Sequence, residues 1–259
     1  EAAPAGSPAK TPAAARTSKR KADSVVNAAE KVNALPPSTG RDEVDPLLKQ
    51  WNVPYHQTRR ALRASQEQSG TGPLHTHTFY TVDCTHHSLW QVLALEMSWE
   101  RVQQGGFISR VISGCGKAKP GKPEMMTRNV FQRETSKGKF GSFFAPDFSV
   151  LPDGEYYAPY NRPNGVWYWL NHTDLTEAVF VLLDPDMLYM RRLNVEAVRP
   201  GRPHAQYYAY MDFQKLGEYD CPLCAKPGSF PRKDYAVGPP WMLHVDDFRK
   251  VMPTWVPLV

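Results

Sequence analysis

The feature that most constrains the fold is a run of five apolar residues, VFVLL, at positions 179–183. A run this short is typical of a strand that is buried on both faces, as in the centre of a parallel sheet. The run is followed directly by Asp184-Pro185-Asp186. Because proline cannot donate a hydrogen bond to a ladder, the strand should stop there. The sequence therefore predicts a central strand whose carboxyl end carries two acidic residues.

Segments before this run predict neighbouring strands. Residues 78–84 (TFYTVDC) alternate and are rich in β-branched and aromatic side chains, which indicates a strand. Residues 88–102 have the apolar spacing of a helix with Ser88 as its N-cap, and residues 107–113 (FISRVIS) predict a second strand. Strand, helix and strand in this order form the unit of a parallel α/β sheet.

Later segments are expected to complete the sheet. Pro163 occupies the first-turn position of a helix that extends to Asn171. Further strands are expected around residues 205–210 and 242–245. The predicted fold class is therefore α/β, with a sheet flanked by helices.

The first 40 residues have a different composition. They are rich in Ala, Pro, Ser, Thr and Lys, with almost no large apolar residues before Leu35, so they predict a flexible, disordered stem. An amphipathic helix is plausible over residues 45–68, interrupted at Pro54. We divide the chain into a stem or linker, residues 1–70, and a folded domain, residues 75–259.

The basic charge of the chain is concentrated in the stem. Residues 1–70 hold 11 Lys and Arg against 7 Asp and Glu, which leaves only +1 of the total +5 for the remainder. The folded part shows no basic cluster with interleaved aromatic residues, so we expect no nucleic-acid partner. The run Lys19-Arg20-Lys21 resembles a nuclear address but is also typical of a solvated charge cluster. No apolar run approaches the roughly 18 residues of a membrane helix, so we expect any membrane anchor to lie outside this chain.

The two acidic residues after the central strand are candidate metal ligands. Positions two apart on an extended chain project to the same side, and open α/β sheets bind ligands at the carboxyl ends of their strands. Such oxygen ligands suit Mn²⁺ or Mg²⁺, with a diphosphate supplying further ligands. The alternative is a solvated turn, where Asp and Pro are common. His244, next to another acidic pair, is a candidate nitrogen ligand to the same metal or an ordinary strand-end histidine.

Other polar and aromatic residues allow two interpretations each. Arg162 precedes the Pro163 helix, where it could meet a phosphate or remain a surface arginine. Three tryptophans could stack on a base or sugar, or fill a core: Trp90, Trp167 and Trp169. Two cysteine pairs, Cys84 with Cys115 and Cys221 with Cys224, could each form a disulfide in an oxidising lumen, and free thiols in a reducing compartment fit equally well.

Several segments resemble, in the same order, those of plant and green-algal glycosyltransferases. They are HTFYTVDC (77–84), WQ (90–91), GFISRVIS (106–113), YNRPNGVWYWL (160–170), LLDPDM (182–187), GRPHAQYYAYM (201–211) and HVDDFRKVMPTW (244–255). The families concerned are the peptidyl serine α-galactosyltransferases and the related hydroxyproline O-arabinosyltransferases. The last two segments are more similar to the first family, whereas GGFISRVISG and NRP also resemble the second.

The resemblance implies a GT-A-like, Rossmann-related mixed sheet flanked by helices. It also implies a UDP-sugar donor, retention of anomeric configuration, and Ser or hydroxyproline of hydroxyproline- and serine-rich glycoproteins as acceptor. The implied location is the Golgi or endoplasmic reticulum lumen, with type II membrane topology. Asp184 and Asp186 carry over as the catalytic metal-binding pair. Candidate donor contacts are Thr81, Val82 and Asp83 for the nucleoside, and Arg110, Asn161, Arg162 and Asn164 for the phosphates and sugar.

Two departures from the family pattern qualify these expectations. The pattern continues beyond the PTW segment, so we expect the catalytic unit to be incomplete in this chain, and the insert 116–144 has no clear counterpart. Serine α-galactosyl transfer is the favoured reaction. The alternatives are hydroxyproline O-arabinosyl transfer, a non-catalytic sugar- or UDP-binding module of the same fold, and a nuclear protein.

Overall fold

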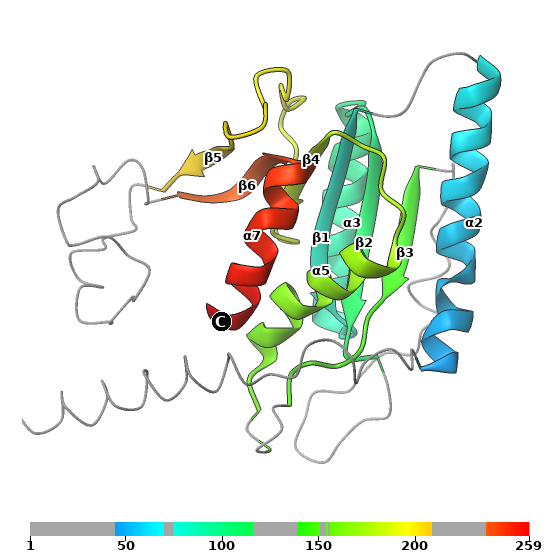
Figure 1. The fold of residues 1–259 in the computed structure, drawn as a ribbon, viewed down its shortest axis with the longest axis vertical. Helices are drawn as coiled ribbons and strands as arrows, with labels where there is room; N and C mark the ends of the chain where they lie inside the picture. Colours follow the sequence, from blue (N-terminus) through cyan, green and yellow to red (C-terminus); the bar gives the residue numbers. More distant parts are fainter. Residues whose placement is uncertain are drawn as a thin grey trace, which may run out of the picture. The chain divides into compact units, whose positions relative to one another are not determined.

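The computed structural model describes residues 45–69, 75–115, 139–150, 154, 156–208 and 237–258. Its elements are α2 (Pro46–Ser69), β1 (Thr76–Asp83), α3 (His86–Arg101), β2 (Phe107–Ser113), β3 (Phe140–Phe144), the 3-10 helix η2 (Ala158–Tyr160), α5 (Asn161–His172), β4 (Val179–Leu183), β5 (His204–Tyr207), β6 (Val237–His244) and α7 (Val245–Leu258). The strands form a six-stranded sheet in the order β3-β2-β1-β4-β6-β5 (Figure 1). The first four in this order run parallel, and β6 is antiparallel to both of its neighbours. The α/β prediction is confirmed as a mixed sheet flanked by helices.

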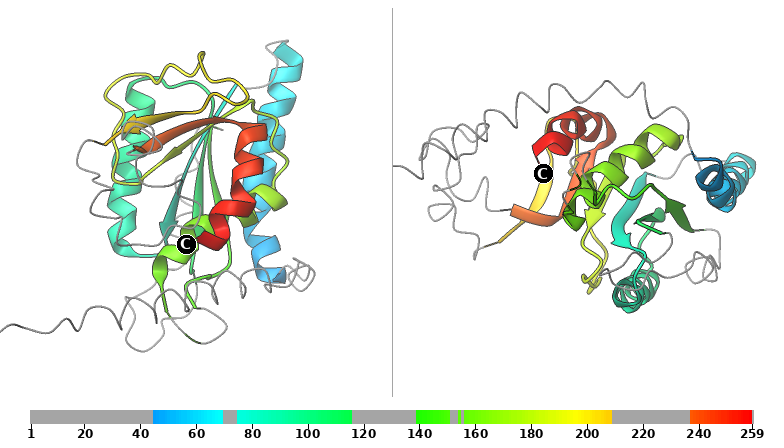
Figure 2. Two further views of the ribbon diagram at one scale, coloured as in Figure 1. Left: turned by 60° about the vertical axis from the view of Figure 1, so that its left-hand side comes forward. Right: turned by 90° about the horizontal axis from the view of Figure 1, so that it is seen from below.

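The central strands are covered on both faces (Figure 2). Every residue of β2 and β4 is buried. One face packs against α3 and the segment 187–198, and the other against α5 and α7. Burial on both faces requires nearly continuous apolar runs. This requirement explains why the strands over 107–113 and 179–183 were predicted with their observed bounds.

Helix α2 lies beside β3, at the edge of the sheet (Figure 1). The side-chain amide of Asn52 bonds both backbone groups of Phe144, donating to its oxygen at 2.9 Å and accepting from its nitrogen at 2.7 Å. Tyr55 is buried against Gly141, where a Cβ would lie 2.6 Å from the tyrosine ring. The helix predicted over 45–68 is thus confirmed, and Pro54 lies inside it without interrupting it.

This packing changes the expected start of the folded part. Residues 46–69 fall in the predicted stem, yet they contribute to both hydrophobic clusters of the sheet. Helix α2 therefore belongs to the packed part of the chain, which was expected to start near His75. The remainder of the predicted stem, most of the 116–144 insert, and Cys221 and Cys224 lie outside the described residues.

Three local features differ from the sequence prediction. Thr85, not Ser88, caps α3, because Thr85 has extended backbone angles and its hydroxyl accepts from the Ser88 N–H. Strand β3 falls within the predicted insert and pairs with β2. Helix α7 begins at Val245, where only a strand end was expected.

Cys84 and Cys115 form a disulfide with an S–S distance of 2.05 Å. The two residues follow β1 and β2, so the bond joins the loops at the carboxyl ends of these neighbouring strands. Of the two cysteine pairs for which the sequence left a disulfide or free thiols open, this one is a disulfide. None of the described helices is both long and apolar enough to span a membrane.

Candidate functional site

The carboxyl ends of β1 and β4 bring together four of the predicted site residues. The two strands are adjacent and parallel, so Asp83 and Asp184 lie at the same end of the sheet, where the strands finish. Helix α5 begins at this edge with Asn161, whose Nδ2 donates to Asp83 Oδ1 at 3.2 Å. The next residue, Arg162, forms an ion pair with Asp184, with 2.6 Å between Nη1 and Oδ1. This is the edge at which open α/β sheets bind ligands.

Helix α5 reaches this position because Gly165 allows a close approach to β2. A Cβ on Gly165 would lie 2.7 Å from the hydroxyl oxygen of Ser113, which is too close for any real side chain. A larger residue would require the Ser113 hydroxyl to rotate away or the helix to shift. The glycine within NRPNGVWYWL therefore allows α5 to pack closely on the end of β2.

Arg162 has hydrogen-bonding capacity left over. Its Nε and Nη2 are buried and have no hydrogen-bond partner among the described residues. The Arg162 side chain is 32% exposed and that of Asp184 is 29% exposed. A buried guanidinium N–H without an acceptor costs free energy. Binding of an anion that accepts from it would therefore be favoured. The amino end of α5, which has no side-chain cap, adds favourable potential for an anion.

Asn161 holds the site together. Its Oδ1 accepts from the Phe148 N–H at 2.7 Å while its Nδ2 donates to Asp83, and its side chain is buried. Both ends of the amide are therefore used to join the loop after β3 to the end of β1. Asn161 therefore positions Asp83, and its predicted contact with the donor's phosphates and sugar stays a prediction.

Asp83 is a partly buried acceptor. Burial raises the pKa of Asp83, the hydrogen bond from Asn161 opposes this rise, and the nearby charge of Asp147 adds to it. A carboxylate placed near a second carboxylate attracts cations and hydrogen-bond donors. The site thus combines a cationic part around Arg162 with an anionic part around Asp83.

Arg110 does not belong to this site. It lies in the middle of β2, and its guanidinium is buried between two groups, with Nη2 donating to Glu96 Oε1 at 2.6 Å and Nε to the Tyr80 hydroxyl at 3.2 Å. The interpretation of Arg110 as a phosphate contact is wrong, because its charge is neutralised within the core.

His244 lies at the opposite end of β4. Because β6 is antiparallel, His244 pairs with Val179, the first residue of β4. Asp184 is five residues further along, which on an extended chain is about 16 Å away. The prediction that His244 and Asp184 share a metal is therefore wrong. The acidic pair after His244, Asp246 and Asp247, forms part of the first turn of α7, where acidic residues offset the helix dipole.

The remaining predicted contact residues differ in burial and in partners. Thr81 is half-buried near the end of β1, whereas the Val82 side chain is buried in the core. Asn164, in the first turn of α5, donates to the carbonyl of Tyr160, the last residue of η2, at 2.9 Å. Of the tryptophans, Trp169 is entirely buried and Trp90 is 57% exposed.

The donor set limits what metal site is possible. Asp184 and Asp186 follow β4 as predicted, and Asp186 is exposed. In the part of the chain that the structure describes, no group of three or more His, Cys, Asp or Glu could hold a metal ion. Two carboxylates fit a Mn²⁺ or Mg²⁺ ion that takes its other ligands from water and a diphosphate, and do not fit a site built by protein alone.

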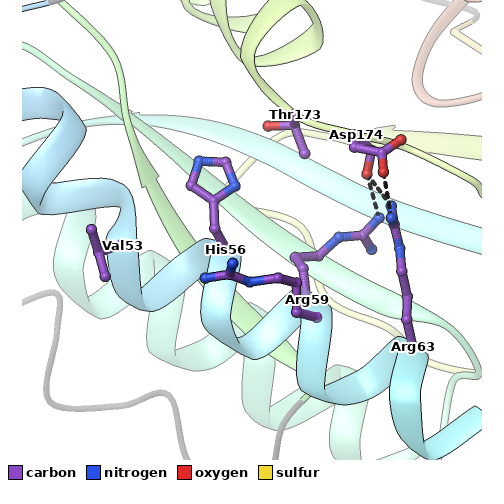
Figure 3. Close-up of a pocket in the computed structure, with 7 residues that line it drawn as sticks. Val53, His56, Arg59, Arg63, Thr173 and Asp174 are labelled. Carbon is purple, nitrogen blue, oxygen red and sulfur yellow. Dashed lines mark hydrogen bonds and ion pairs between the residues drawn. The ribbon is translucent and has the colours of Figure 1, made fainter.

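A cavity of about 430 Å³ lies elsewhere, between α2 and the turn after α5 (Figure 3). Its lining residues are Val53, His56, Arg59, Arg60, Arg63, Thr173 and Asp174. Both terminal nitrogens of Arg59 donate to the carboxylate of Glu177, two residues before β4. The cavity is therefore at the amino end of β4, away from Asp184.

Beside this cavity is a buried network that the sequence did not predict. His77 Nδ1 lies 3.3 Å from Glu177 Oε1, and the side chains of Arg59 and Glu177 are only 6% and 2% exposed. Burial would raise the pKa of Glu177, but His77 and Arg59 outweigh burial and hold it well below its usual range. Burial lowers the pKa of His77, and the Glu177 carboxylate opposes this shift. This network fastens α2 to the sheet.

Comparison with known proteins agrees with the resemblance found in the sequence. The pattern of the hydroxyproline O-arabinosyltransferase family N-terminal domain matches residues 77–259. A peptidyl serine alpha-galactosyltransferase of Arabidopsis thaliana is 29% identical over 200 residues, covering 74% of this chain and 22% of that protein. One of Chlamydomonas reinhardtii is 28% identical over 210 residues, covering 74% and 26%. The chain spans about a quarter of the length of these curated relatives. It belongs to the hydroxyproline O-arabinosyltransferase family, which it matches through the N-terminal domain.

Proposed function

We propose that this chain binds a UDP-sugar at the carboxyl ends of β1 and β4, as part of a glycosyltransferase that modifies serine or hydroxyproline in peptides. The names of the family and of the relatives support the reaction class. The observation that carries the proposal is the Arg162–Asp184 pair, whose unused guanidinium nitrogens lie at the amino end of α5. A nucleoside diphosphate supplies the anion that this arrangement lacks.

Different residues of the site would contact different parts of the donor. Arg162 would bind a phosphate oxygen, with Asp184 holding its guanidinium in place, and Asp83 would accept hydrogen bonds from the nucleoside. Thr81, two residues before Asp83 on β1, would contact the same part of the donor. Asp184 and Asp186 would hold Mn²⁺ or Mg²⁺, whose charge stabilises the departing nucleoside diphosphate when bound.

The transfer that we propose retains anomeric configuration. The bond between the sugar's anomeric carbon and the phosphate oxygen breaks, and a bond from the acceptor hydroxyl oxygen to that carbon forms. The acceptor's proton passes to the departing phosphate oxygen, so the products are UDP and a glycosylated peptide, and the step needs no separate protein base. The relatives' name favours serine and galactose, whereas the family name favours hydroxyproline and arabinose.

A GT-A-like assignment and a location in the Golgi or endoplasmic reticulum lumen, with type II membrane topology, belong to the same proposal. The parallel strands around β1, covered by helices on both faces, support the first. The Cys84–Cys115 disulfide supports an oxidising compartment.

The test is a donor screen with a matched pair of variants. The full-length protein is incubated with several UDP-sugars, Mn²⁺ and a peptide containing serine and hydroxyproline, and the mass of the product is measured by mass spectrometry. We expect the mass of one sugar to be added, and the rate to fall by about a hundredfold or more in Arg162→Gln. Arg249→Gln, an exposed arginine on α7, is the control and should keep the full rate. UDP binding without any turnover would indicate a non-catalytic module, and equal rates in both variants would overturn the assigned site.

A further inference from the structure

The cavity between α2 and the turn after α5 is lined mainly by basic side chains. Positions 56, 59, 60 and 63 of α2 are three or four residues apart, so they lie on one face of the helix. In Figure 3, His56, Arg59 and Arg63 point from α2 towards the turn that holds Thr173 and Asp174. A volume of about 430 Å³ is within the range of pockets that bind small molecules. Its size and its wall therefore favour a small anionic ligand.

The arginines of the cavity are not fully neutralised. Arg59 pairs with the buried Glu177, and Arg63 pairs with Asp174, whose side chain is 79% exposed. Arg60 also lines the cavity, is exposed, and has no hydrogen-bond or ion-pair partner among the described residues. Three guanidinium groups thus face two carboxylates, which leaves an excess of one positive charge.

The pKa of His56 reflects this excess of positive charge. Burial lowers the pKa of His56, and the charges of Arg60, Arg59 and His172 lower it further. Cationic neighbours from both α2 and α5 therefore disfavour a further positive charge at this ring. An anion bound in the cavity would offset their combined potential.

Three buried donors at the cavity lack an acceptor. The Thr173 hydroxyl has no hydrogen-bond partner within the described ranges, and the same holds for Nε of Arg59 and Nε of Arg63. Thr173 is only 8% exposed and Arg59 only 5%. Buried polar groups are normally hydrogen-bonded, because a buried donor without an acceptor costs free energy. All three groups can be satisfied by the same kind of partner, an oxygen that accepts.

A phosphate or sulfate group supplies such oxygens. It carries negative charge over three oxygens, and each of them can accept from a guanidinium or a hydroxyl. Arginine suits these groups especially well, because its planar fork of donors matches the spacing of their oxygens. Val53 adds an apolar side chain to the wall, against which the organic part of a ligand would pack.

The cavity crosses the boundary of the family match. The matched residues 77–259 include the turn with Thr173 and Asp174, whereas α2 lies outside them. The basic side chains come from α2, so the cavity exists only because this helix packs on the matched domain. The family match therefore assigns no ligand to it.

We propose that this cavity binds a small molecule through a phosphate or sulfate group. Arg60 would pair with the anion, and Thr173 would donate its hydroxyl to it. The cavity is at the amino end of β4, away from Asp184, so the inference does not rest on the proposed donor site. Because the ligand would contact both α2 and the turn after α5, it would stabilise the attachment of α2 to the sheet.

The test is isothermal titration with inorganic phosphate and, in parallel, with inorganic sulfate, at constant ionic strength and with sodium chloride as the blank. We expect the wild type to bind at least one of the two anions, and the tighter one identifies the head group of the ligand. Arg60→Gln should weaken binding at least about tenfold, and Thr173→Val about fivefold. Lys49→Gln removes the same charge from an exposed position of α2 outside the cavity, and should leave the Kd unchanged.

Thermal melting separates loss of the ligand site from loss of the fold. Without ligand, Thr173→Val should melt no lower than the wild type, because a methyl group replaces a hydroxyl that has no partner. Phosphate or sulfate should raise the Tm of the wild type more than that of Arg60→Gln. No binding of either anion by the wild type overturns the inference, as does an equal Kd in Arg60→Gln or an equal loss in Lys49→Gln.

A further variant distinguishes this cavity from the proposed donor site. Arg162→Gln alters the donor site and should keep the affinity for the inorganic anion. Loss of anion binding in Arg162→Gln, with normal binding in Arg60→Gln, would place the anion at the donor site and overturn the inference. Failure of the wild type to bind UDP would instead contradict the proposed function alone.

Discussion

Both ends of β4 have an arginine–carboxylate pair nearby. The two pairs differ in burial and in how many nitrogens of the guanidinium group are hydrogen-bonded. At the amino end, Arg59 and Glu177 are 6% and 2% exposed, and both terminal nitrogens of Arg59 bond the carboxylate. At the carboxyl end, Arg162 and Asp184 are 32% and 29% exposed. There Nε and Nη2 of Arg162 have no partner within the described residues, whereas Arg59 leaves only Nε unbonded. We infer that the buried pair, with both terminal nitrogens bonded, stabilises the fold, and we propose the partly exposed pair, with donors left unbonded, for a ligand.

The largest expected effect comes from breaking the buried pair. Glu177→Gln removes the charge that offsets Arg59, and we expect the free energy of unfolding to fall by about 3–5 kcal/mol. Urea denaturation followed by circular dichroism measures this loss. The control is Asp174→Asn, which removes an acid that is 79% exposed and paired with Arg63. It should cost less than about 1 kcal/mol, and equal losses in both variants would contradict the distinction.

The disulfide should contribute nearly as much at the other end. It closes a loop across a sequence separation of 31 residues, for which chain entropy predicts about 3–4 kcal/mol. Replacing Cys84 and Cys115 by alanine should lower the unfolding free energy by this amount in the same denaturation experiment. A loss below about 1 kcal/mol would show that the loops after β1 and β2 are held mainly by other contacts.

The pH dependence of stability should come largely from the amino end. Because the pKa of His77 is lowered by burial, only the unfolded chain takes up this proton as the pH falls through about 6.5, and stability decreases. The pKa of Glu177 is also lowered, so its contribution is full above about 4.3, the unfolded value, and is lost progressively below it. Denaturation at a series of pH values should show both losses. In Glu177→Gln the loss below about 4.3 should shrink, and an unchanged profile would refute this assignment.

The smallest expected effect is a gain in stability at the candidate site. Since the pKa of Asp83 is raised, the charged form destabilises the folded state above the unfolded pKa. Asp83→Asn should therefore stabilise the protein by up to about 1 kcal/mol at neutral pH, while weakening UDP binding. The gain should vanish at a pH low enough to protonate the carboxyl in both states. Thermal melting measures this gain in stability. A Tm of Asp83→Asn below that of the wild type at neutral pH would contradict the expectation that the Asp83 carboxylate destabilises the folded state.

The central strands could be predicted from the sequence because burial on both faces leaves a local pattern. Runs such as VFVLL specify a strand without reference to any other part of the chain. Strand β3 was missed, and part of what holds it is not local in sequence, because the backbone groups of its last residue, Phe144, bond the Asn52 side chain of helix α2. Strand direction also leaves no local pattern, and the antiparallel course of β6 is what places His244 at the far end of β4.

The candidate site was predictable in part for the same reason. The acidic residues that follow β4 and the polar residues that open α5 were identified, because strand ends and helix starts have sequence patterns. The burial of Arg110 against Glu96 and the use of Asn161 as a link to Asp83 depend on tertiary contacts. Roles that depend on a partner from another element required the structure.

The most direct test of the central claim is isothermal titration of UDP with Mn²⁺ present, comparing two matched acid-to-amide variants. Asp184→Asn alters the open pair at the carboxyl end, and Asp174→Asn alters an exposed pair at the amino end. We predict that Asp174→Asn binds UDP as the wild type does and that Asp184→Asn binds at least about tenfold more weakly. Wild-type affinity in Asp184→Asn, or a matching loss in Asp174→Asn, would contradict the assignment of the ligand site to the carboxyl ends of β1 and β4.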